Sequence, residues 1–440
     1  MDKIETSRKK PFFLIAIIFA ISLVSLKWIL SYIYFDEDII LRIINDSSDS
    51  AYYPIIKTFA DFNFSPSYSK ILDNLKIISF PVISLFINSF FFKIIGGYSF
   101  IFLEIICTTL FILIFYNVLV KLNFSNLYSL TCSLFLFILP TFLIDLTFID
   151  IKILDLITVN LQKFYSMRFP RPVISNLFLF TFIYFVVDFF LKKENYIKNF
   201  YILAILLGLT INTFFYHSFL EFFLLIILSI LKFKKDFFKI ILKKLKNFIF
   251  SLLIILIFIV IFQLQVFYSE PDYVERLGVF YLNSNQKIIL FEYLTKFFFG
   301  KKFIFLFLVN TTFFLMLKDK HIRIFYFLFL SSILSPVFFF LIFNKGVDYY
   351  HFFDWIVISG ILFPIISIMH LIELKVLKRL KDSHLTISIK FFLILMILYF
   401  NISNGLKFKD NVEKENFART NLNEVTSFFF KNEYLKDKNL

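Results

Sequence analysis

About ten apolar runs of roughly 20 residues each follow one another along this chain, separated by short polar segments. A run of that length is what a helix needs to cross the hydrocarbon core of a bilayer. The chain is 59% hydrophobic and its mean hydropathy is +0.81, whereas soluble domains are about 45–50% apolar. The sequence therefore predicts an all-α polytopic transmembrane helical bundle of about 10–11 helices and excludes a large soluble domain.

The runs divide the chain into a transmembrane domain, residues 1–404, and a short polar tail, residues 405–440. The first run, Pro11 to Phe35, follows a basic N-terminus and lacks a small-residue cleavage site, so we expect it to be a retained anchor. A long loop, residues 36–76, comes next. Isoleucines at helical spacing near its start favour an interfacial helix on the outer membrane face.

The charge distribution indicates a membrane protein and argues against a nucleic-acid-binding one. The formal net charge is +14, but Lys and Arg form short clusters between the apolar runs, as the positive-inside rule expects of cytoplasmic loops. The strongest cluster is Lys232 to Lys246. We therefore expect a cytoplasmic N-terminus, contact with membrane lipid, and an outer location for loop 36–76 and for the tail. The two cysteines, Cys107 and Cys132, lie in apolar runs and provide neither a disulfide framework nor a metal site.

Two segments complicate the count of membrane crossings. In the first half the basic clusters alternate correctly only if the run 77–95 is re-entrant or if segment 148–164 crosses back, and the sequence leaves this choice open.

The run 201–231 is long enough for two short helices with a break near residues 212–218. Residues 269–300 are expected to be a loop with an amphipathic piece. Asp188 and Glu221 are placed near span ends, where snorkelling to the interface explains them.

Three consecutive carboxylates, Asp36, Glu37 and Asp38, follow the first apolar run directly. A carboxylate at a partly desolvated membrane surface can deprotonate an acceptor hydroxyl as a general base. The same carboxylates can hold a divalent cation that bridges a phosphate. The alternative is that they form a solvated helix end without a chemical role.

Further candidate residues lie in the segments that the charge pattern places on the outer side. Arg168 and Arg171 are framed by Pro170 and Pro172, and two guanidinium groups on a stiff loop suit a phosphate or pyrophosphate headgroup. His217, at the expected helix break, and Arg276 and His351, in outer loops, are additional candidates for contacts to phosphate or sugar. Solvated loop residues and a structural histidine are the alternatives.

The layout resembles the C-type membrane glycosyltransferase superfamily, polytopic enzymes that take sugar from a polyprenyl-phosphate carrier. These proteins carry an acidic motif in a long first outer loop just after the first helix, and Phe35-Asp36-Glu37-Asp38 matches it in place and residue type. The resemblance implies that Asp36 or Asp38 is the catalytic base, with Glu37 beside it. It also implies that the outer arginines and later outer-loop residues meet the carrier phosphate. The expected setting is polysaccharide biosynthesis at the plasma membrane of a bacterial cell envelope.

Two other functions remain as alternatives. An O-antigen-polymerase-like enzyme also acts on lipid-linked glycans and also uses outer-loop arginines. A transporter or flippase for such lipids is expected to show ionisable residues at mid-membrane depth and broken helices. The charges in this sequence lie mostly at span ends, which favours an enzyme over a transporter.

Overall fold

The apolar runs form helices in the computed structural model of the chain, and the only strand pairing among the described residues joins β1 (Phe280–Tyr281) to β2 (Lys345–Gly346). The structure describes residues 2–36, 52–64, 81–145, 173–191, 196–268, 280–342, 345–347, 349–374, 388, 392–410 and 412–414.

The described residues form two sets of helices. Those of the first half are α1 (Asp2–Tyr34), α3 (Tyr52–Ala60), α4 (Val82–Ile95), α5 (Ser99–Lys121), α6 (Asn126–Asp145) and α8 (Val173–Leu191), with a 3-10 turn (Gly96–Tyr98) between α4 and α5. Those of the second half are α9 (Tyr196–Phe233), α10 (Phe237–Lys243), α11 (Leu245–Tyr268), α12 (Ser284–Phe298), α13 (Lys301–Met316), α14 (Arg323–Ile342), α15 (Tyr350–Ile372) and a last helix, Phe392–Lys414.

Eight helical stretches in the described part of the chain are long and apolar enough to cross a membrane. The pair α12 and α13 passes the same test as one span bent by 51°. The prediction of an all-α polytopic bundle is confirmed, and the chain is an integral membrane protein with multiple spans. Where the sequence indicated a loop with an amphipathic piece at residues 269–300, the structure has helix α12, which begins with a capping box at Asn283 and Gln286.

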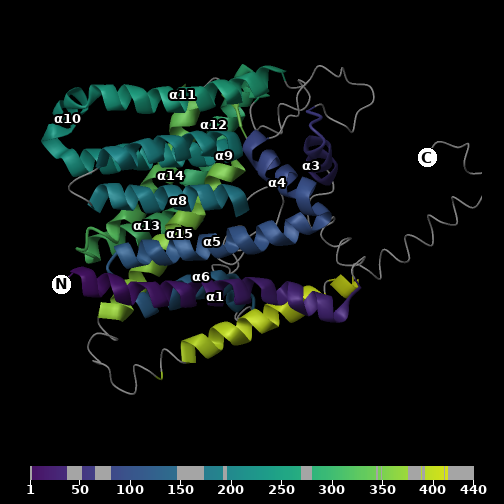
Figure 1. The fold of residues 1–440 in the computed structure, drawn as a ribbon. Coiled ribbons are helices and arrows are strands. Elements are labelled where there is room, and N and C mark those ends of the chain that lie inside the picture. Colours follow the sequence, from purple (N-terminus) through teal and green to yellow (C-terminus); the bar gives the residue numbers. More distant parts are fainter. Residues whose placement is uncertain are drawn as a thin grey trace, which may run out of the picture.

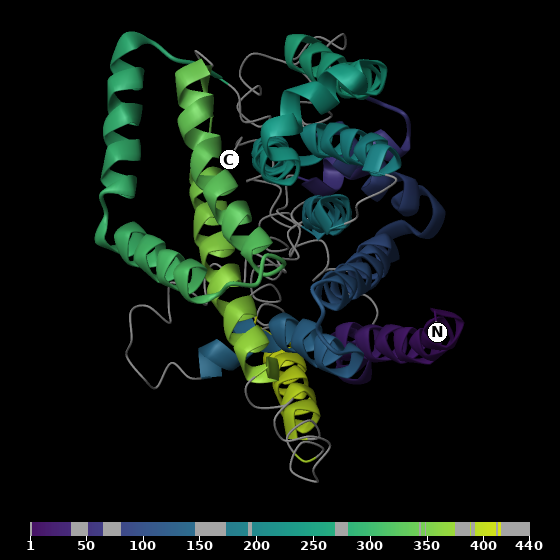
Figure 2. The same cartoon turned by 90° about the vertical axis from the view of Figure 1, so that its left-hand side faces the viewer.

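Five helices lie side by side in the order α11, α9, α8, α5 and α1 (Figure 1). Figure 2, turned by 90°, shows these helices nearly end-on, while α12 to α15 are drawn along their length. The second group is therefore inclined to the first. The last helix packs on α1, where Asn401 Nδ2 donates to the carbonyl of Leu23 at 3.0 Å and Gly405 approaches Leu30.

Polar contacts between helix termini define the two ends of the bundle. Lys121, which ends α5, pairs with Asp188 of α8 at 2.8 Å, and Lys232 of α9 donates to the carbonyl of Phe189. We call this the proximal end. The opposite end, where α1 ends at Tyr34 and where α5 and α8 begin, is called the distal end.

Basic residues gather at the proximal end. The turn Lys234–Asp236 and helix α10 follow directly on α9 there. The segment 317–322 lies at the same end, because Asn123 contacts His321 at 2.7 Å. Three clusters of Lys and Arg that are far apart in the sequence therefore lie together at the proximal end. They are near residues 121, 232–246 and 318–323.

Helix α9 folds back on itself at Phe214, whose backbone angles (φ −159°, ψ 87°) are not helical. Thr210 Oγ1 lies 3.1 Å from Glu221 Oε1, although a straight helix would separate residues 11 positions apart by about 16 Å. Both ends of α9 are proximal, since Asn199 also donates to Asp188 at 2.8 Å. The predicted break at residues 212–218 is confirmed, and α9 provides two antiparallel passes.

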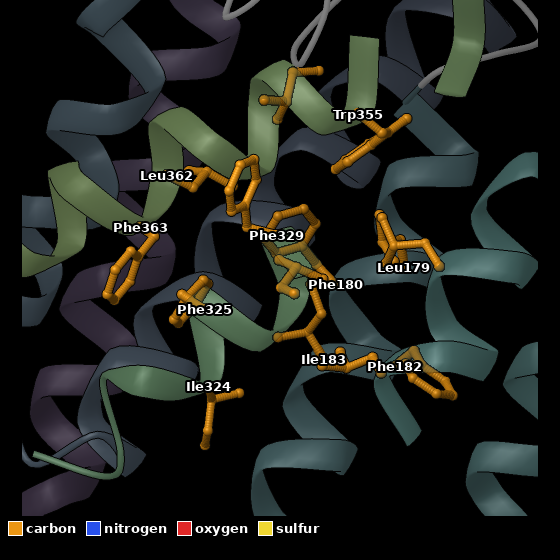
Figure 3. Packing of buried hydrophobic residues seen from close by; sticks show 14 of the residues in the cluster. Leu179, Phe180, Phe182, Ile183, Ile324, Phe325, Phe329, Trp355, Leu362 and Phe363 are labelled. Carbon is orange, nitrogen blue, oxygen red and sulfur yellow. The ribbon is translucent and has the colours of Figure 1, made fainter. Parts of the chain in front are cut away.

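The largest apolar core lies where α8 and α9 meet α14 and α15. Figure 3 shows Phe180 and Ile183 of α8 close to Phe325 and Phe329 of α14, with Trp355 of α15 above them; all five are buried. By contrast, only 17% of the apolar window of α11 is buried, and only 28% of that of the α1 span Phe13–Tyr34. The side chains that these two helices expose are large and apolar, as lipid contact requires.

Helix α4 belongs to the distal end and is too short to cross. Its 14 residues span about 21 Å, less than the roughly 30 Å hydrocarbon core. It packs on α3, where Ser89 donates to the carbonyl of Ile56 at 3.0 Å, and it leads through Gly96 (φ 59°) straight into α5. The choice between a re-entrant run 77–95 and a segment 148–164 that crosses back stays a prediction, because residues 77–80 and 148–164 lie outside the described residues.

We predict that Gly208→Leu loosens α11 from the bundle. A Cβ at position 208 would lie within 2.8 Å of three ring atoms of Phe258, so the two helices must separate or the ring must move. Overpacking of this kind costs about 1–3 kcal/mol. Thermal unfolding in detergent, followed with a thiol-reactive dye that detects exposure of the buried Cys107 and Cys132, should show a clear drop in Tm.

The matched control is Ile205→Leu, on the lipid-exposed face of the same half of α9, which should leave Tm unchanged. An equal Tm for Gly208→Leu and wild type would mean that α11 is not held by this close approach.

Candidate functional site

Asp36 is the second residue beyond α1 at the distal end, and its side chain is exposed. The preceding residue, Phe35, packs against an apolar cluster that includes Ile55 and Phe59 of α3 and Leu85 of α4. Asp36 therefore lies at the junction of α1 with the α3–α4 pair. Glu37 and Asp38, the other two members of the acidic cluster, lie outside the described residues.

A groove of about 430 Å³ lies between α3 and α4 in the same region. Its walls are almost entirely aromatic or aliphatic: Phe59, Phe62, Phe64, Phe86, Phe90 and Ile94. Lys93, at its edge, forms an exposed ion pair with Asp61 at 2.9 Å. Because Phe59 belongs both to the groove and to the cluster that holds Phe35, the groove and Asp36 form one local assembly.

His217 and His351 are brought together by the fold-back of α9. The Phe214 ring lies between them, with ring centroids 4.7 Å from His217 and 4.9 Å from His351. Trp355, one turn after His351 on α15, packs edge-on against His217 at 4.6 Å. His217 is fully buried and His351 is half-buried, so the two imidazoles form one aromatic cluster at the distal end.

The acidic and histidine parts of the predicted site share an end of the bundle. Figures 1 and 2 both show α5 and α8 between α1, which ends just before Asp36, and α9, which carries His217; α4 packs on both α5 and α9. Arg168, Arg171 and Arg276 lie outside the described residues. The described residues therefore hold two distal centres, one at Asp36 and the groove, the other at the two histidines.

An ion pair inside the bundle was not found by sequence reasoning. Lys27 of α1 pairs with Glu104 of α5, and Trp28 Nε1 donates to the same carboxylate at 2.7 Å. Glu104 is buried, and the Lys27 ammonium also lies 5.1 Å from the centre of the Phe408 ring. The available signal was a lone Lys and a lone Glu, each within an apolar run. Each charge has its partner, which indicates a structural link between α1 and α5.

Glu221 does not snorkel to the interface, contrary to the prediction. Its side chain has no solvent exposure, because α9 folds back and encloses it; Thr210 is its hydrogen-bonding partner, and Oε2 has none. Asp188 is likewise 7% exposed and is engaged by Lys121 and Asn199 rather than by water. Sequence alone could not indicate this burial, because it depends on which helices enclose the carboxylates.

A metal centre is not formed by the described residues, since no group of three His, Cys, Asp or Glu side chains among them is placed to hold an ion. The carboxylates considered for a divalent cation include Glu37 and Asp38, which are not among them. The cation therefore stays a prediction.

We predict that Lys27→Met destabilises the protein strongly. The change leaves Glu104 as a buried carboxylate without its cation, which typically costs about 3–5 kcal/mol. The thiol-dye unfolding assay measures the loss. The double variant Lys27→Met/Glu104→Gln removes the orphaned charge and should recover most of the stability. A single variant as stable as the double one would show that the pair is not formed.

No family model, curated protein or solved structure matches this chain.

Proposed function

We propose that this chain is an integral membrane glycosyltransferase that uses a polyprenyl-phosphate-linked sugar at the membrane face formed by the distal end. The observation that carries the proposal is the pairing of an exposed carboxylate, Asp36, with a phenylalanine-lined groove in one local assembly. A lipid-linked donor needs both parts: an apolar site for its chain and a polar site for the sugar and phosphate at the membrane surface.

The roles follow from residue chemistry. Asp36 or Asp38 acts as the general base that takes the proton of the acceptor hydroxyl, and Glu37 supports the negative charge of the cluster or a bound cation. Arg168 and Arg171 hold the carrier phosphate through bidentate hydrogen bonds. His217, Arg276 and His351 contact the sugar or phosphate from the second distal centre.

The distal end faces the outer compartment in this proposal, and the N-terminus is cytoplasmic. The support is the gathering of basic residues at the proximal end, including the clusters at 232–246 and 318–323. Under the positive-inside rule, the face with the excess of Lys and Arg is cytoplasmic. The donor is then used at the outer face of the plasma membrane.

We expect Asp36→Asn and Asp38→Asn, singly or together, to abolish most sugar transfer while the protein still folds. Loss of a general base typically lowers the rate by about 10²–10⁴-fold. Asp36 is exposed, so the amide costs little stability. The measurement is transfer of labelled sugar from a polyprenyl-phosphate donor in membranes, normalised to expression. Asp46→Asn, in the same loop, is the control and should match wild type.

Wild-type transfer rates in both single variants and in the double variant would reject the acidic cluster as the base. In that case a second candidate, a transporter or flippase of lipid-linked glycans, takes precedence. The observation that favours it is the broken helix α9 with the fully buried Glu221 beside the break, because ionisable groups and interrupted helices inside the bundle are typical of transporters.

We expect Ile94→Trp to weaken donor binding by narrowing the groove. Ile94 is 62% exposed and lines the groove, so the larger ring can be accommodated without unfolding the bundle. The KM for the lipid-linked donor should rise several-fold with kcat nearly unchanged, since the reacting atoms are elsewhere. Ile18→Trp is the matched control: it is 55% exposed, on α1, and does not line the groove. Equal KM values for the two variants would remove the groove from the donor site.

A further inference from the structure

Among the described residues, Glu221 differs from three other buried carboxylates in having neither a cation nor a backbone N–H donor as a partner. Glu373 accepts from the N–H of Ser125 at 2.7 Å, and the other two have cations. Glu104 pairs with Lys27, and Asp188 pairs with Lys121. Among the described residues, no Lys, Arg or His forms an ion pair with Glu221, and its Oε2 has no hydrogen-bonding partner. An ionised carboxylate at such a place would lose its hydration without compensation.

The hydrogen bonds of Thr210 point to a proton on this carboxyl group. Thr210 Oγ1 lies 2.8 Å from the carbonyl oxygen of Leu206 and 3.1 Å from Glu221 Oε1. A hydroxyl group has one hydrogen, and the carbonyl can only accept. Both contacts are hydrogen bonds at once if the hydroxyl donates to Leu206 and accepts from the protonated carboxyl of Glu221.

A titratable side chain connects this carboxyl to the distal end. His217 precedes Glu221 by four residues on the same half of α9, so the two side chains lie on one face about 6 Å apart along the axis. His217 lies next to the break at Phe214, and His351 lies across the Phe214 ring. Imidazole gains and loses protons near neutral pH, which suits it to pass a proton inward.

The other charged groups on elements packed against α9 are held near the ends of those elements. Asp188 of α8 is engaged at the proximal end, and Lys93 of α4 pairs with Asp61. In α14, Arg323 donates to the carbonyls of Phe314 and Leu317 at the proximal end. Lys246 near the start of α11 is proximal too, and Asp354 of α15 is half-buried one turn from His351.

We propose that Glu221 is a proton-binding site and that it exchanges its proton with the distal side of the membrane through His217. The proton passes from the carboxyl group to an imidazole nitrogen and then to water, and it returns by the reverse route. Loss of the proton leaves a carboxylate that Thr210 alone solvates, so water must enter between the two halves of α9. Protonation thereby controls how tightly the fold-back closes. The proposal does not depend on the glycosyltransferase function.

The proton itself is tested with a hydrophobic carbodiimide, which adds to protonated carboxyl groups in the membrane and gives a stable N-acylurea. The full chain is treated in proteoliposomes and the adducts are located by mass spectrometry. Glu221 should be modified and Glu221→Gln should not. Glu104, buried but paired with Lys27, is the internal control and should stay unmodified. No adduct at Glu221, or equal modification of Glu104, would overturn the proposal.

The route is tested by infrared spectroscopy of the same proteoliposomes. The carbonyl band of the protonated carboxyl should be absent in Glu221→Gln, and its shift in D₂O reports proton exchange. His217→Phe keeps an aromatic ring against Trp355 and should slow exchange by roughly 10²-fold or more, as expected when a positioned proton-transfer group is lost. His370→Phe, a buried histidine at the proximal end, should exchange as wild type does. An unchanged exchange rate in His217→Phe would exclude the route.

Discussion

Polar groups inside an apolar bundle must be satisfied by the protein itself, and this constraint is strongest at the fold-back of α9. The break at Phe214 interrupts helical hydrogen bonding at the distal end of the bundle. Polar side chains on both halves are hydrogen-bonded near the break: Asn212 Nδ2 donates to the carbonyl of Phe258 in α11 at 2.9 Å, and Ser218 donates to that of Phe215 at 2.5 Å. The first of these bonds also fixes α11 against α9. The fold-back of α9 therefore contains hydrogen-bonded polar side chains and also holds α11 in place.

The buried charges divide by the presence or absence of a partner. The pair Lys27–Glu104 joins α1 to α5, and the pair Lys121–Asp188 joins α5 to α8 at the opposite end. These ion pairs fix α1, α5 and α8 relative to one another, and this structural role accounts for their burial. Glu221 has a hydroxyl group as its only partner, and for that reason the chemistry of proton binding is assigned to it and not to Glu104 or Asp188.

The distal end combines the features that a lipid-linked substrate would need, but in two centres. One is formed by Asp36 with the groove of α3 and α4, the other by His217 and His351 with their aromatic neighbours. Helices α5 and α8 lie between α1 and α9, whereas α4, which forms one wall of the groove, packs directly on α9 (Figure 1). A donor and an acceptor that occupy different centres, or a substrate extended along the distal face, fit this arrangement.

The sequence by itself determined the membrane class, the all-α fold, the basic clusters and the break near residues 212–218, because these depend on local composition and on run length. Only the tertiary structure decided that Lys27 meets Glu104, that Glu221 is enclosed, and that α5 and α8 lie between α1 and α9. The physical reason is that lipid and protein interior are both apolar. A spanning helix is then hydrophobic around its whole circumference, and its sequence does not show which face meets a neighbour. The helices of soluble proteins have a polar side, and it indicates which face is buried. In this chain only the tertiary structure shows which helices are neighbours.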